Sequence, residues 1–217
     1  PFSKPNLTNI QRAKIIIEQS FSDFGDLDLL ILIEGEQTHA VLLEAKVKTY
    51  QANTWLISSE WSKFKQLSES NSTSNLFIQL YRKMRLVRKV KDINRELGGD
   101  ILSSRWSLGE NAIVKKAAQE LSQYCSNSWF VALIPDTKEN LEQFVKNKLQ
   151  SPPQNLPDWD SSKFGYLTWA DLEEYCKSNS NLWQQTIANF DYNHGQIFGE
   201  AFQNEGTSGS SQNKFVL

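Results

Sequence analysis

The fold is decided by residues 27–47, LDLLILIEGEQTHAVLLEAKV, which hold two apolar runs around a short polar turn. Residues 27–33 and 39–47 are rich in Leu, Ile and Val, and residues 34–38 (EGEQT) contain the polar residues and the glycine expected of a turn. Two apolar runs separated in this way predict a β-hairpin.

Four charged side chains stand at the open end of this hairpin. Asp26 and Asp28 begin the first strand, and Glu44 and Lys46 end the second. A turn centred on Glu36 places Asp28 opposite Glu44 and Asp26 opposite Lys46, and because strand side chains alternate, all four share one face. Facing carboxylates repel each other, and a divalent cation between them removes the repulsion. Oxygen ligands suit Mg²⁺ or Mn²⁺, and a neighbouring lysine stabilises a developing oxyanion. The structural alternative is an ion-pair cluster at a sheet edge.

Hydrophobic periodicity predicts the remaining elements. Helices are predicted over residues 8–21, 50–68, 75–92, 110–125, 137–149, 169–177 and 181–190, and strands over 129–134 and 164–168. This order predicts a layered α/β domain with a mixed sheet covered by helices. We interpret residues 1–205 as a single domain and the Gly/Ser-rich residues 206–217 as a flexible tail.

Composition excludes several classes of protein. The chain has 217 residues and a net charge of −2, so an anionic ligand needs a local basic patch. Two cysteines exclude a disulfide-rich scaffold and a four-cysteine zinc module. The sequence has neither an apolar run of membrane-spanning length nor an apolar signal core at its start, and we expect a cytoplasmic protein without a membrane partner.

Residues 25–31 (GDLDLLI) and 41–47 (VLLEAKV) resemble the paired motif of the PD-(D/E)xK nuclease superfamily, which has a restriction-endonuclease-like fold. The resemblance maps the two metal-binding carboxylates onto Asp28 and Glu44 and the catalytic lysine onto Lys46. It also implies a metal contact from the backbone carbonyl of Ala45. No proline precedes Asp28, so Asp26 remains a rival for the first ligand position.

Two positions outside the hairpin extend the resemblance. Many members carry a Glu on the helix before the motif, and Glu18 occupies that place, although pairing with Lys14 on an exposed helix is the alternative. Gln79-Leu80-Tyr81 is similar to the Gln and Tyr that some members carry on the following helix. The resemblance implies a three-layer α-β-α fold and metal-dependent hydrolysis of phosphodiester bonds, with Mg²⁺ or Mn²⁺ as cofactor.

A basic segment at residues 82–91 suggests the ligand. On a helix, Arg82, Arg85 and Lys89 would form a ridge that contacts phosphates, and a solvated polar face is the alternative. We therefore expect a nuclease acting on nucleic acid, DNA ahead of RNA, working as a homodimer or beside a protein partner. The alternative function is a catalytically inactive module of the same fold that binds nucleic acid or protein.

Overall fold

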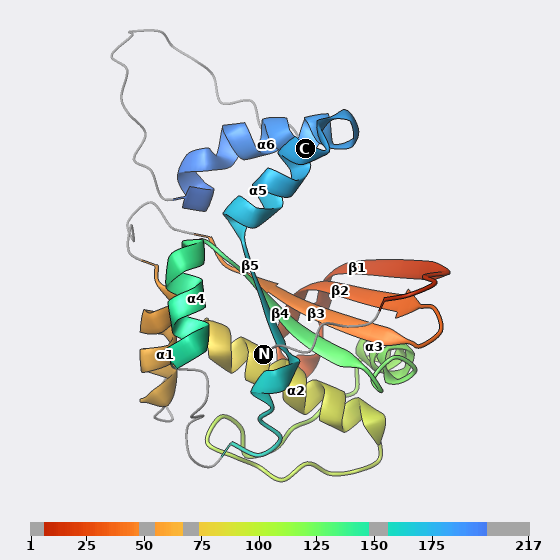
Figure 1. Cartoon of the computed structure of the whole chain (residues 1–217). Coiled ribbons are helices and arrows are strands. Elements are labelled where there is room, and N and C mark those ends of the chain that lie inside the picture. Colours follow the sequence, from red (N-terminus) through yellow and green to blue (C-terminus); the bar gives the residue numbers. More distant parts are fainter. Residues whose placement is uncertain (1–6, 48–54, 67–73, 148–155, 199–217) are drawn as a thin grey trace, which may run out of the picture.

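The computed structural model describes residues 7–47, 55–66, 74–147 and 156–198. In these residues the chain forms a five-stranded mixed sheet flanked by helices (Figure 1). The strands are β1 (Arg12–Ser20), β2 (Asp26–Glu34), β3 (His39–Ala45), β4 (Ser128–Ile134) and β5 (Phe164–Thr168). The helices are α1 (Ile57–Lys65), α2 (Leu76–Lys91), α3 (Ala112–Ser122), α4 (Lys138–Asn147), α5 (Trp169–Ser178) and α6 (Ser180–Phe198), with short 3₁₀ turns η1 (Ser22–Phe24) and η2 (Ser161–Lys163).

The strands lie side by side in chain order, β1-β2-β3-β4-β5. β1, β2 and β3 form an antiparallel meander, and β4 and β5 continue the sheet parallel to β3. Parallel neighbours need a long crossover, and α1, α2 and α3 lie between β3 and β4 in the chain. The predicted mixed α/β architecture is confirmed at this level.

The β2–β3 hairpin has the predicted register. Leu29 pairs with Leu43, Leu30 with Leu42 and Ile31 with Val41, as a turn centred on Glu36 requires. The second strand ends at Ala45, two residues earlier than predicted.

The helix predicted over residues 8–21 is wrong, because this segment forms strand β1. The three consecutive β-branched residues Ile15, Ile16 and Ile17 favour a strand. Ile15 and Ile17 are 62% and 70% exposed, whereas Ile16 packs against the core, so the segment alternates with the period of a strand. Pairing with β2 along its length outweighs the helical spacing of its apolar residues. The strand predicted over residues 164–168 is found with these bounds, and the other predicted elements are found with shifted ends. Residues 50–54, 67–68 and 148–149 lie outside the described residues.

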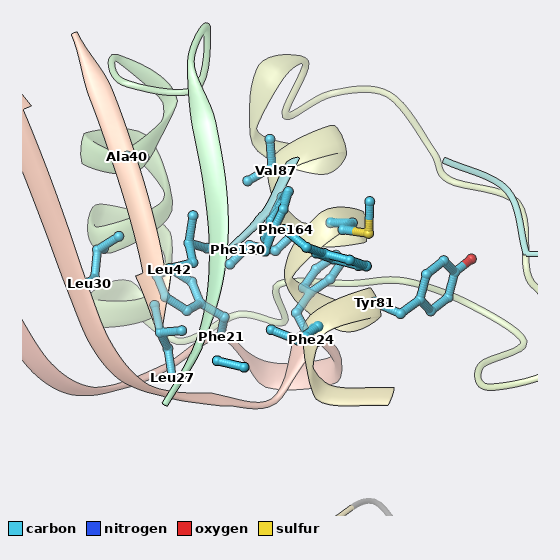
Figure 2. Packing of buried hydrophobic residues seen from close by; sticks show 14 of the residues in the cluster. Phe21, Phe24, Leu27, Leu30, Ala40, Leu42, Tyr81, Val87, Phe130 and Phe164 are labelled. Carbon is cyan, nitrogen blue, oxygen red and sulfur yellow. The ribbon is translucent and has the colours of Figure 1, made fainter. Parts of the chain in front are cut away.

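The core lies between the sheet and α2, which runs across one face of it (Figure 1). Leu30 and Leu42 project from the strands toward aromatic side chains that include Phe24 and Phe130 (Figure 2). The side chain of Asn75 caps α2 by accepting hydrogen bonds from the backbone N–H groups of Phe77 and Ile78. This cap fixes where α2 begins, and so which of its side chains meet the strand ends.

The helical pair α5–α6 packs beside the ends of β3 and β5, around a smaller apolar cluster of Cys176, Phe190 and Ile197. Thr168 opens α5 with a capping box formed with Asp171, as its sequence spacing predicted. No helix in the described part of the chain is both long and apolar enough to cross a membrane.

Candidate functional site

The open end of the β2–β3 hairpin meets the N-terminal half of α2. Asp28 has the same strand parity as Leu30 and Leu32, and Glu44 the same as Ala40 and Leu42. These apolar residues are all buried in the core, as is Leu27 of the opposite parity. Asp28 and Glu44 lie close enough for the charge of Asp28 to raise the pKa of Glu44.

Asp28 is exposed and hydrogen-bonded to the neighbouring strand. Its Oδ2 accepts the backbone N–H of Ala45 at 2.7 Å. The N–H and C=O groups of one residue in an extended strand face the same neighbour, so the carbonyl of Ala45 faces the side where Asp28 lies. Asp28, Glu44 and Ala45 thus offer oxygen atoms at adjacent positions of two strands.

Glu44 is buried and forms an ion pair with Lys83 of α2. The distance from Lys83 Nζ to Glu44 Oε1 is 3.2 Å, and both side chains are only 1% exposed. Burial raises the pKa of Glu44 and is opposed chiefly by the charge of Lys83, whereas the charge of Asp28 adds to the rise. Burial also lowers the pKa of Lys83, and Glu44 opposes that change.

The backbone before β2 is shaped to receive this lysine. Lys83 Nζ also donates hydrogen bonds to the carbonyl oxygens of Phe24, at 3.0 Å, and Asp26, at 2.5 Å. Gly25 between them has φ +74°, a conformation that favours glycine, and a Cβ there would lie 3.5 Å from Lys83 Nζ. The glycine therefore lets both carbonyls turn toward the ammonium.

Lys46 lies just past the end of β3 and is held by two other elements. Its Nζ donates a hydrogen bond to Oε1 of Gln79 on α2. Its carbonyl oxygen accepts the indole N–H of Trp169 at 2.6 Å, and its N–H donates to Leu133 O at 2.8 Å. The predicted lysine and the Gln of the loosely matching Gln-x-Tyr segment are thus in direct contact.

Sequence reasoning missed Lys83, which it placed only within the basic segment. A signal was present, because residue 83 falls inside the apolar stripe formed by Leu80, Met84 and Val87. Gln79, Arg82 and Lys83 have the i, i+3, i+4 spacing of one helix face. A buried lysine in such a stripe needs an acceptor for its charge. Glu44, an acid inside an apolar strand, was the available candidate.

Glu18 lies on β1 and not on a helix. Its neighbours Ile17 and Gln19 pair with Leu29 and Leu27, so Glu18 stands beside Asp28 in the sheet, exposed and with φ +53°. The alternative, a pair of Glu18 with Lys14 on a helix, is wrong because the segment is a strand, and Lys14 pairs with Glu120 of α3. The rival ligand Asp26 is exposed at the start of β2.

The predicted basic ridge does not form as one exposed surface. Arg85 is buried, with Nη1 2.6 Å from Asp158 Oδ2 and Nε 3.6 Å from Asp100 Oδ2. Its guanidinium also lies 5.5 Å from the ring centre of Trp106. Arg82 and Lys89 are half-buried, and Lys89 donates to the carbonyl of Arg95 at 2.6 Å. The segment is helical, as predicted. However, Asp100, Asp158 and the carbonyl of Gly98 in the loop after α2 cover the side chain of Arg85.

The donor set around Asp28 fits a hard divalent cation such as Mg²⁺ or Mn²⁺. Two carboxylates and one backbone carbonyl are all oxygen donors, the kind such ions prefer. Mutual repulsion of Asp28 and Glu44 contributes to the raised pKa of Glu44, and a cation would relieve it. In the described residues no three His, Cys, Asp or Glu side chains come together as a metal-binding group.

Comparison with known proteins found no match to a family model, to a curated protein or to a solved structure.

Proposed function

We propose that this protein is a metal-dependent nuclease of the PD-(D/E)xK type, which hydrolyses phosphodiester bonds in nucleic acid, DNA ahead of RNA. The observation that carries the proposal is the placement of Asp28, Glu44 and Lys46 on one hairpin end, with Lys46 held by Gln79. The restriction-endonuclease-like form of the α/β fold belongs to the same proposal. It is supported by the position of the acid-x-Lys segment at the end of the strand next to the one that carries Asp28.

Asp28, one oxygen of Glu44 and the Ala45 carbonyl would hold the cation. When bound, Mg²⁺ lowers the pKa of a coordinated water and neutralises phosphate charge. Lys46 orients the attacking water and stabilises the charge that develops on the phosphoryl oxygens. Gln79 accepts a hydrogen bond from the Lys46 ammonium and so fixes its direction.

The test is cleavage of labelled DNA and RNA oligonucleotides with Mg²⁺ or Mn²⁺, with EDTA as the blank. Asp28→Asn keeps an oxygen that can accept the Ala45 N–H, so it should fold while losing metal binding and cleavage together. Glu142→Gln, an exposed change on α4, is the matched control and should cleave like the parent. Metal-independent cleavage, or cleavage equal in Asp28→Asn and the parent, would refute the proposal.

A second candidate is a catalytically inactive module of the same fold that binds nucleic acid or protein. It is favoured by the buried Lys83–Glu44 pair, which already neutralises Glu44 without a metal. The two candidates differ in their response to Mn²⁺. The nuclease gains thermal stability from Mn²⁺ through Asp28, whereas an inactive module melts at the same temperature with Mn²⁺ or EDTA.

A further inference from the structure

The ammonium of Lys83 lies among three oxygen atoms of the protein. It donates hydrogen bonds to Phe24 O and Asp26 O and forms an ion pair with Glu44 Oε1, which accepts no hydrogen bond from the described residues. Two of these oxygens are backbone atoms held by the turn at Gly25. Lys83 is therefore a fixed cation at a defined oxygen of Glu44.

This position limits what else can bind Glu44. A metal ion on Oε1 would lie against the Lys83 ammonium, and like charges so close repel strongly in a buried site. A second divalent cation on Oε1 of Glu44 would have to displace the Lys83 ammonium, which the carbonyl oxygens of Phe24 and Asp26 also hold.

We infer that Lys83 takes the place of a second divalent cation, so that the site holds one metal ion per chain. The ion would bind through Asp28, the other oxygen of Glu44 and the Ala45 carbonyl. Lys83 is then a positioning residue, which orients the Glu44 carboxylate without touching the substrate. This inference rests on the proposed function and adds its metal stoichiometry.

The experiment counts Mn²⁺ ions per chain by isothermal titration calorimetry, with electron paramagnetic resonance of free Mn²⁺ as the second readout. The wild-type protein should bind one ion. Lys83→Ala should bind two, or bind one at least about tenfold more tightly, because the competing charge is gone. Lys63→Met removes an exposed positive charge on α1, away from the hairpin end, and this control should still bind one.

The outcomes separate the inference from the function on which it rests. Two Mn²⁺ ions in the wild type, both lost in Asp28→Asn, would overturn the inference and leave the nuclease proposal standing. One ion in the wild type, with unchanged number and affinity in Lys83→Ala, would also overturn it. If the wild-type protein bound no Mn²⁺, both the one-metal inference and the nuclease proposal would be refuted. If Lys83→Ala does not fold, the wild-type count decides alone.

Discussion

Replacing Lys83 by Met tests whether the charges at this site depend on each other. The substitution keeps the length and apolar character of the side chain and removes the ammonium that pairs with Glu44. Both partners are almost fully buried, 3.2 Å apart. Removing one member of a buried pair costs about 3–5 kcal/mol, because the other charge stays buried without compensation. For a chain of this size that lowers Tm by roughly 6–20 °C.

The double variant Lys83→Met, Glu44→Gln removes both charges and should lose less stability than the two single changes added together. A coupling energy of about 2–3 kcal/mol is expected. The assay is urea unfolding followed by circular dichroism in EDTA. Lys63→Met provides the matched control, because Lys63 lies 3.4 Å from Glu60 but is 72% exposed, and it should cost about 0–1 kcal/mol. Additive single effects, or a loss in Lys83→Met no larger than the control, would refute the reasoning.

Further predictions concern the neighbouring groups. Lys46→Ala should keep Mn²⁺ affinity within a few-fold while cleavage falls about 10²–10³-fold, since Lys46 acts on the transition state; equal loss of binding and cleavage would contradict this. Because burial raises the pKa of Glu44 above 4.5, its contribution to stability is present below that pH and is lost as the pH rises through the raised pKa. The unfolding free energy of the wild type should therefore fall relative to Glu44→Gln over that window, and parallel pH profiles would show no such linkage. Arg85→Met should lose about 3–5 kcal/mol in urea unfolding, because the guanidinium is buried against Asp100. The same variant should leave the salt dependence of DNA binding unchanged, whereas a slope reduced by about 0.9 would restore Arg85 as a phosphate contact.

The hairpin was predictable because two independent signals agreed. The apolar runs indicated the two strands, and the turn centred on Glu36 indicated the register, in which Leu29 pairs with Leu43 directly beside Asp28 and Glu44. The segment of Ile15 to Ile17 misled the prediction, since its spacing also fits a helix face and only pairing with β2 decides in favour of a strand.

The partners of the basic residues were not predictable from local sequence. Arg85 meets Asp100 and Asp158, which lie 15 and 73 positions away in the chain, so the sequence pattern of α2 alone cannot distinguish a buried ion pair from an exposed ridge. Lys83 pairs with Glu44, which lies 39 positions before it in the chain. In both cases long-range contacts decide which face of α2 is buried.

A crystal soaked in Mn²⁺, with anomalous data collected at the manganese edge, tests most directly the central claim that Asp28 and Glu44 hold a divalent cation beside Lys46. The account predicts one peak per chain, with carboxylate oxygens of both Asp28 and Glu44 roughly 2.0–2.5 Å from it and the Lys46 ammonium on the same side. No peak at the hairpin end, or a peak held by other residues while Glu44 stays paired with Lys83 alone, would contradict the account.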